Sequence, residues 1–230
     1  MTGDTTKTEL WPKPDFQCPL PDFPLNVFAA VGFLTGQGPM VCGGLRGEKK
    51  CFLYKEHQWM HWTTMGTSRV YASALQIGQN KSGMIIGGID EKGSLKISSH
   101  CSFNLNSTHG MVTGGLYEHN QRGSKVLLLS ENTFFVDLTK GLSAIAKRIS
   151  GPSINTARND HGCSIFHHGG KSYGIVSGGW DGYNLLDSTE MFDLDHLDQR
   201  PNGGWFRLSW TEGMQDKSKI VYLKLKSSFS

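Results

Sequence analysis

Nine histidines are the residues of this sequence with the widest chemical use, because an imidazole serves as a metal ligand and as an acid–base group. Those that gather with cysteine or with one another are His100-Cys101, His109, His161-Gly162-Cys163 and His167-His168. A structural zinc site needs two ligand pairs, such as Cys-x2-Cys with a second pair downstream, and no cluster has that spacing. The sequence therefore predicts no metal ligands and no cofactor.

Asp160 and His161 are adjacent and could act as an acid–base pair. They belong, however, to the run Asn-Asp-His-Gly directly before the apolar segment 163–166, and such a run is typical of a turn. The sequence also lacks a Gly-x-Ser-x-Gly elbow, a P-loop and a Gly-x-Gly-x-x-Gly motif opening a helix. We therefore predict no catalytic residue and expect a protein that is not an enzyme.

The five cysteines bear on the compartment. Cys42 ends one apolar run and Cys51 begins the next, so a hairpin would place the two side chains opposite each other within bridging distance. They are either a disulfide or two small buried apolar residues of a cytosolic protein. Cys18, Cys101 and Cys163 show no evident partners in the sequence.

Pairs of glycines follow short apolar runs at four places and define a repeated unit. The pairs are Gly43-Gly44, Gly87-Gly88, Gly114-Gly115 and Gly178-Gly179. Each ends a predicted strand, where the missing Cβ allows a left-handed or bulged turn and a close approach to another strand. A repeated β-unit of this kind must stack on its neighbours to bury its apolar face. The sequence therefore predicts an all-β array.

The residues after the glycines make the units more specific. Trp59 and Trp62 follow the first pair, and Trp205 follows the last; we predict that they are structural aromatics. A diglycine after an apolar strand, a polar turn, an aromatic second strand and a late tryptophan resemble the blade of the kelch-repeat family. The resemblance covers roughly residues 25–208, although no tryptophan follows Gly87-Gly88 before the next pair.

The kelch resemblance implies an antiparallel β-propeller of four or five blades, or a partial ring. Residues 1–24 are expected to be an extended lead-in and residues 25–230 the propeller. The interval from Gly87 to Gly114 is the shortest between pairs, which predicts that part of a blade is missing there. Secreted kelch-like proteins carry a similar cysteine pair, which favours the disulfide between Cys42 and Cys51. Kelch-like copper oxidases of the galactose oxidase type use two tyrosines and two histidines, but no local pattern here matches that site.

Charge and hydropathy exclude some partners. The chain has 23 basic and 20 acidic residues without a basic cluster, so nucleic acid is not an expected partner. No apolar stretch reaches the ~20 residues of a membrane span. Cytoplasmic and secreted locations are both left open.

In a propeller, the turns after successive diglycines fall on one face and could form a shared binding surface. The predicted partner-binding residues in these turns are Arg46, Tyr117, Arg122, Trp180 and Tyr183. We therefore expect a non-enzymatic module that presents blade loops to a protein partner. The alternatives are a secreted propeller that recognises carbohydrate or matrix and, with less support, a copper oxidase.

Overall fold

The computed structural model describes residues 21–78, 82–93, 97–143, 148–195 and 204–208. In this part of the chain the structure is all-β, as the sequence predicts: sixteen strands form antiparallel sheets, and the helical structure is limited to the short 3₁₀ helix η1 (Leu138–Ser143). Most of the expected lead-in, residues 1–24, lies outside the described residues. Its Phe23 is buried, with ring contacts to Phe52 and Trp59.

Among the described residues three sheets have four strands each and two have only two. One of the two-stranded sheets is the hairpin of β9 (Leu116–Gln121) and β10 (Ser124–Leu129); the other four sheets are numbered here in chain order. The first sheet contains β1 (Val31–Thr35), β2 (Gly38–Cys42), β3 (Lys50–Lys55) and β4 (Gln58–Thr64). The second contains β5 (Ser73–Ile77) and β6 (Ser82–Ile86). The third contains β7 (Cys101–Asn104), β8 (His109–Thr113), β11 (Thr133–Asp137) and β12 (Ile149–Ser150). The fourth contains β13 (Gly162–His168), β14 (Lys171–Ser177), β15 (Thr189–Asp193) and β16 (Phe206–Leu208).

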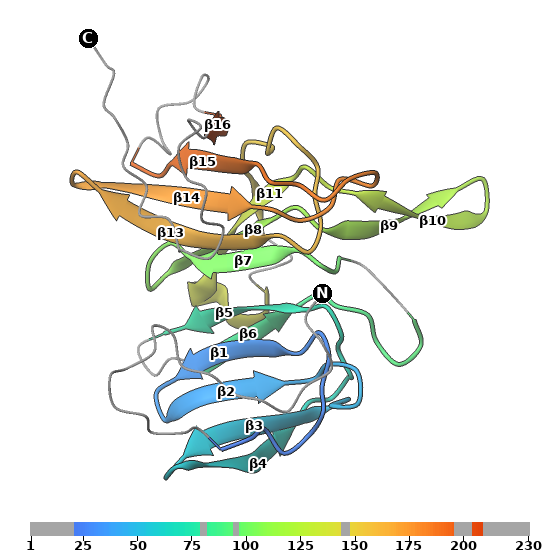
Figure 1. The fold of residues 1–230 in the computed structure, drawn as a ribbon, viewed down its shortest axis with the longest axis vertical. Coiled ribbons are helices and arrows are strands. Elements are labelled where there is room, and N and C mark those ends of the chain that lie inside the picture. Colours follow the sequence, from blue (N-terminus) through green and yellow to red (C-terminus); the bar gives the residue numbers. More distant parts are fainter. Residues whose placement is uncertain (1–20, 79–81, 94–96, 144–147, 196–203, 209–230) are drawn as a thin grey trace.

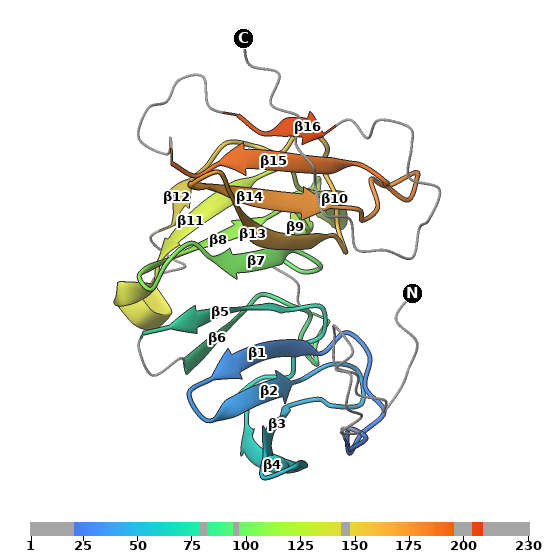
Figure 2. The same cartoon turned by 60° about the vertical axis from the view of Figure 1, so that its left-hand side comes forward.

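The first strand of each sheet lies beside the first strand of the next. β1 contacts β5, β5 contacts β7, and β7 contacts β13. Figures 1 and 2 show β1–β6 in one half of the molecule and β7–β16 in the other. Among the described residues no comparable contact joins β13 back to β1, so no closed ring is detected.

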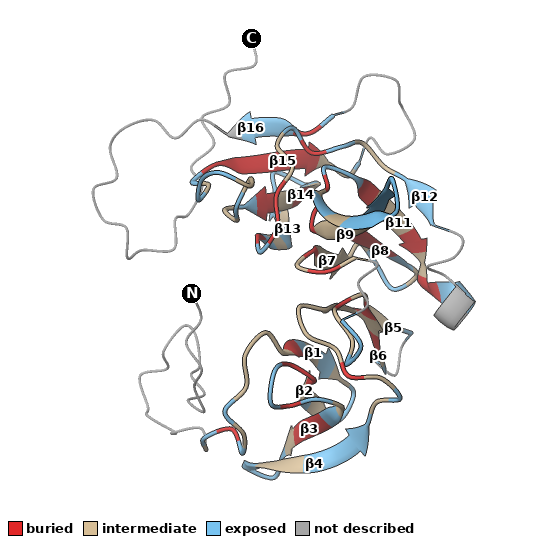
Figure 3. Cartoon of the chain, turned by 90° about the vertical axis from the view of Figure 1, so that its right-hand side faces the viewer, coloured by how far each residue is buried: buried red, intermediate tan, exposed pale blue. Residues whose placement is uncertain are grey.

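Apolar clusters lie between successive sheets and hold them together. Between the second and third sheets, Leu75 and Met84 pack against Val112 and Val136. Between the third and fourth, the core is Met111, Ile154, Val176, Phe192 and Trp205. In Figure 3 much of the middle strands is buried, whereas β4 and β16 at the outer edges are exposed. The sheets are therefore stacked face to face, and each depends on its neighbours for its core.

Short two-residue turns explain several hairpins. Gly169-Gly170 joins β13 to β14, and both residues have positive φ (58° and 76°). Arg122 and Gly123, with φ of 50° and 85°, join β9 (Leu116–Gln121) to β10 (Ser124–Leu129). Two positive φ values are typical of a type I′ turn, whose twist matches that of the flanking strands. The β9–β10 hairpin corrects the prediction that Tyr117 lies in the turn after its diglycine, because Tyr117 belongs to strand β9.

All eight glycines of the four pairs have positive φ, between 63° and 94°. The second glycine of three pairs donates its N–H to a distant carbonyl: Gly44 to Arg69, Gly88 to Ile97 and Gly115 to Arg158, at 2.7–2.8 Å. The residue after every pair forms a β-bridge to the segment that precedes its sheet: Leu45 with Phe28, Ile89 with Val70, Leu116 with Ser98 and Trp180 with Asn159. After the second strand of each unit, the diglycine therefore turns the chain back to the segment that precedes the first strand of that unit.

The glycine pairs differ in how much room surrounds them, and this gives a test. A Cβ at Gly87 would meet the Ile97 carbonyl and lie 2.8 Å from His100 Cε1, whereas at Gly178 the nearest atom, the Leu186 carbonyl oxygen, is 3.7 Å away. Gly178→Ala is expected to lower the free energy of unfolding by about 1–2 kcal/mol through its left-handed backbone alone. Gly87→Ala should cost at least about 1 kcal/mol more, because a clash adds to the strain. Urea denaturation of the two variants measures the difference, and equal losses would contradict it.

A fully buried ion pair stabilises the fourth sheet. Arg158 Nη2 donates to Glu190 Oε1 at 2.6 Å, and both side chains are completely buried. The Arg158 Nη1 atom also donates to the carbonyls of Gly178 and Ser188. The second Glu190 oxygen accepts from the backbone N–H and side-chain amide of Asn155. The pair therefore ties the last diglycine turn to β15 and to the segment before β13.

Candidate functional site

Four equivalent segments, one before the first strand of each sheet, meet at the diglycine end of the molecule. We call them the hub segments: Phe28–Ala30, Val70–Ala72, Ser98–His100 and Asn159–His161. The middle residue of each has positive φ, between 51° and 59°, which is uncommon for residues other than glycine. The hub segments therefore share one unusual backbone conformation, which repeats from unit to unit.

Backbone hydrogen bonds connect the middle residues of successive hub segments. The N–H of Tyr71 donates to the Ala29 carbonyl at 3.1 Å, that of Ser99 to the Tyr71 carbonyl at 2.9 Å, and that of Asp160 to the Ser99 carbonyl at 2.9 Å. Because each bond joins one unit to the next, the four segments are held as a single rigid arc.

The hub segments line an open cavity of about 750 Å³. Its remaining lining comes from the turn after the last diglycine: Gly179, Trp180, Leu185 and Leu186. The one charged residue among the described lining is Asp160, an exposed carboxylate that accepts a hydrogen bond from the Asn159 side-chain amide. With no lysine or arginine in that lining, the cavity offers little attraction to an anion.

Two buried histidines stand at the base of this cavity. His100 and His161 are only 6% and 7% exposed. Burial lowers the pKa of His100 to about 4. Burial, together with the nearby positive charge of Arg158, lowers the pKa of His161 to about 4. Both imidazoles are therefore neutral at pH 7, so each keeps one nitrogen as a hydrogen-bond acceptor.

Several polar atoms of the hub segments lack hydrogen-bond partners in the protein. They are Ser98 Oγ, His100 Nδ1 and Asn159 Oδ1. His100 Nε2, in contrast, pairs with Ser73 Oγ at 2.7 Å. Buried polar groups are nearly always satisfied, by protein, water or ligand. These atoms are buried within hub segments whose other residues line the cavity.

Beside the cavity lies a second feature, an exposed apolar surface on the turn after the last diglycine. We call it the apolar loop surface: Trp180, Tyr183 and Leu185. Tyr183 and Leu185 are the most exposed, at 91% and 87%. The side chain of Asp181 accepts hydrogen bonds from the backbone N–H groups of Tyr183 and Asn184, which fixes this loop and lowers the pKa of Asp181. In Figure 1 the β9–β10 hairpin and the turn after β14 lie on the same side of the molecule.

The predicted partner-binding residues separate into two groups. Trp180 and Tyr183 belong to the apolar loop surface, and Trp180 also lines the cavity. Arg46 and Arg122 are exposed in turns with positive φ, and Tyr117 is half-buried on β9. The sequence reasoning did not identify Leu185. Its signal was a large apolar residue directly after the polar turn at 181–184.

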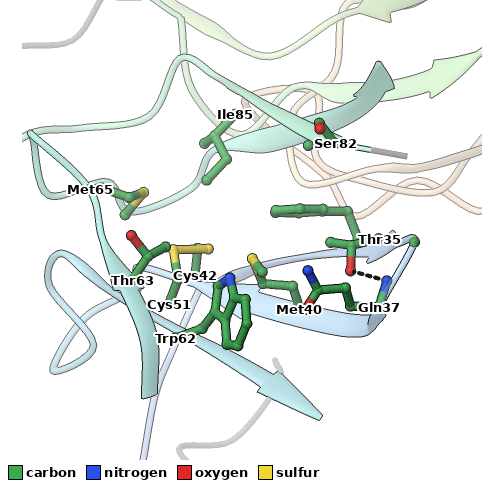
Figure 4. Close-up of a pocket in the computed structure, with 13 residues that line it drawn as sticks. Thr35, Gln37, Met40, Cys42, Cys51, Trp62, Thr63, Met65, Ser82 and Ile85 are labelled. Atoms are coloured by element: carbon green, nitrogen blue, oxygen red, sulfur yellow. Dashed lines mark hydrogen bonds between the residues drawn. A yellow bond between two sulfur atoms is a disulfide. The ribbon is translucent and has the colours of Figure 1, made fainter. Parts of the chain in front are cut away.

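The three predicted structural tryptophans occupy different environments. Trp205 is buried against Phe192 and donates its indole N–H to the Pro152 carbonyl at 3.0 Å. Trp59 is half-buried and contacts Phe23 and Tyr54. Trp62 is 46% exposed. It lies on the wall of a groove of about 360 Å³ between the first and second sheets (Figure 4).

Two disulfides are present. Cys42 and Cys51 face each other across β2 and β3 and form the cross-strand bridge that was one of the two alternatives. A second bridge joins Cys101 on β7 to Cys163 on β13, which corrects the expectation that these cysteines have no partners. They are 62 residues apart in sequence, so only the adjacency of the two first strands brings them together. Cys18 lies outside the described residues.

The described part of the chain has neither a metal-ligand cluster nor a membrane-spanning helix. There, no group of three or more histidine, cysteine, aspartate or glutamate side chains is placed to hold a metal ion. Nor do those residues include a helix of the length and apolarity that crossing a membrane requires.

No protein-family model and no curated protein sequence matches the chain. Among solved structures it is similar to one titled "Structure of YjhT", with a TM-score of 0.61 and 13% sequence identity. The similarity covers 85% of this chain and 68% of that one. At this identity the likeness concerns the fold alone.

Proposed function

We propose that this chain is a divergent, incomplete kelch-type β-propeller that binds a protein partner through its apolar loop surface and does not act as an enzyme. The propeller is supported by four units that repeat one diglycine turn, one hub conformation and one order of contacts. The two disulfides favour an oxidising compartment, because such bonds persist there and are rare in the cytosol.

One observation supports a protein partner above all: large apolar side chains are exposed on loops that the backbone holds rigid. Tyr183 is 91% exposed on a turn fixed by Asp181, and Leu185 beside it is 87% exposed. Large exposed apolar patches mark interaction sites on soluble proteins. Because aromatic residues dominate the energetics of many interfaces, Tyr183 and Trp180 are the expected anchors.

Site-specific photo-crosslinking is the direct test of this surface. A photoreactive residue at position 183 should capture a protein partner, whereas the same residue at position 34 should not. Leu34 is also apolar and exposed (47%), but it lies on β1, in the other half of the molecule (Figure 1). The purified partner should then bind Tyr183→Ala at least about tenfold more weakly. Leu34→Ala should bind as the unmodified protein does. Equal capture at both positions, or unchanged affinity of Tyr183→Ala, would reject the proposal.

The cavity favours a second candidate, recognition of a neutral carbohydrate. Its lining of neutral histidines, Asp160 and Trp180 would suit a ligand that has hydroxyl groups and an apolar face. In that case binding would depend on Trp180 and Asp160 and would not change in Tyr183→Ala. Assaying the same variants against glycans therefore distinguishes the two functions.

A further inference from the structure

In the described part of the chain the second sheet lacks the third strand that the first, third and fourth sheets have. Among the described residues β6 pairs with β5 and with no other strand. The equivalent strands β2, β8 and β14 each pair with a third strand as well: β3, β11 and β15, respectively. The β6 strand therefore presents a free edge of five residues, with backbone groups available for pairing.

Beside this edge lies the groove of Figure 4. Ser82, Gly83 and Ile85 of the second sheet form one wall. The opposite wall, from the first sheet, is the Cys42–Cys51 disulfide with Met40, Trp62 and Met65. Trp62 is 46% exposed there, and Ile85 is only half-buried. An apolar groove and a free strand edge are thus adjacent.

The other units show what fills the equivalent place. Three residues before the first glycine of each pair, Met40, Met111 and Ile175 face Leu53, Phe135 and Met191 of the third strand. At the next position along the strand Val41 faces Phe52 and Val112 faces Phe134, whereas Val176 faces Glu190. The corresponding residues on β6 are Met84 and Ile85. A large apolar residue therefore lies opposite the first position in all three units, and an aromatic residue lies opposite the second in two of them.

From this repetition we infer that the free edge of β6 binds an extended segment of a partner protein as an added antiparallel strand. The segment carries two consecutive large apolar residues opposite Met84 and Ile85. The residue opposite Ile85 enters the groove next to Trp62, because Ile85 faces the first sheet. The backbone hydrogen bonds provide the affinity and the groove provides the selectivity, as in other cases of strand addition. This site is separate from the apolar loop surface.

A synthetic peptide with the sequence of β11, Thr-Phe-Phe-Val-Asp, flanked by lysines for solubility, is the probe. It should bind the full chain and slow hydrogen exchange at the amides of Ser82–Ile86. The matched control peptide carries proline in place of the first phenylalanine; it should not bind, because proline cannot donate to a ladder. Trp62→Ala should weaken binding by about tenfold, and Trp62→Phe should retain most of it.

Two further measurements keep this inference independent of the proposed function. Tyr183→Ala should bind the peptide with unchanged affinity, since Tyr183 belongs to the apolar loop surface. Hydrogen exchange of the protein alone, at increasing concentration, tests for a second copy at the edge. Protection of β6 that rises without peptide, peptide binding that is indifferent to Trp62, or the absence of peptide binding would each overturn the inference.

Discussion

Replacing Glu190 by glutamine is expected to lower the free energy of unfolding by about 3–5 kcal/mol, the usual effect of removing one partner of a buried ion pair. The carboxylate is completely buried and accepts hydrogen bonds from Arg158, Asn155 and Thr156. Glutamine keeps the shape but leaves the Arg158 guanidinium charged without a counterion. Its amide group would also place a donor where the site requires an acceptor.

The control for this prediction is on the same strand. Asp193, which is half-buried, and the exposed Lys171 form an ion pair at 3.7 Å near the surface, so Asp193→Asn should cost less than about 1 kcal/mol. Urea denaturation at pH 7 measures both variants. If Glu190→Gln and Asp193→Asn lose similar stability, the Arg158–Glu190 pair does not have the structural role described here.

Lowering the pH from 7 to 5 is expected to destabilise the protein by about 2 kcal/mol for each of His100 and His161. The pKa of both is lowered from 6.5 to about 4 in the folded protein, chiefly by burial. Between these values the unfolded chain binds more protons than the folded one. The stabilisation is therefore complete above pH 6.5 and is lost as the pH falls through the folded pKa of about 4.

The measurement is the free energy of unfolding in urea at pH 7, 6 and 5, where ordinary carboxylates stay largely ionised. His100→Gln and His161→Gln remove the titrating groups and should each flatten the dependence on pH, whatever their effect on stability at pH 7. A stability profile that is already flat between pH 7 and 5 in the unmodified protein would contradict the burial of neutral histidines.

Local patterns predicted much of the strand structure. The diglycines, with the apolar runs before them, indicated an all-β chain and the positions of four turns. The eight residues between Cys42 and Cys51 indicated a hairpin, so the cross-strand pair was foreseeable as one of two alternatives. The short interval after Gly87 indicated an incomplete unit, and in the described part of the chain the second sheet has two strands. Each of these features depends on residues close together in sequence.

The candidate sites depend on contacts that no local pattern contains. The hub segments meet because the first strands of successive sheets lie side by side, and the same adjacency joins Cys101 to Cys163. The exposure of Tyr183 and Leu185, and of Trp62, is set by which neighbouring sheets do or do not cover them. Likewise Asp160-His161 reads as a polar turn, yet His161 is buried.

The sequence by itself therefore determined the repeated β-unit, because a glycine turn and a hairpin are specified by the conformational limits of a few adjacent residues. The tertiary structure alone decided which units touch and, among the described residues, which strand edges and polar atoms remain unpartnered. Burial and long-range pairing are properties of stacked sheets, and residues far apart in the chain acquire them only when the sheets pack.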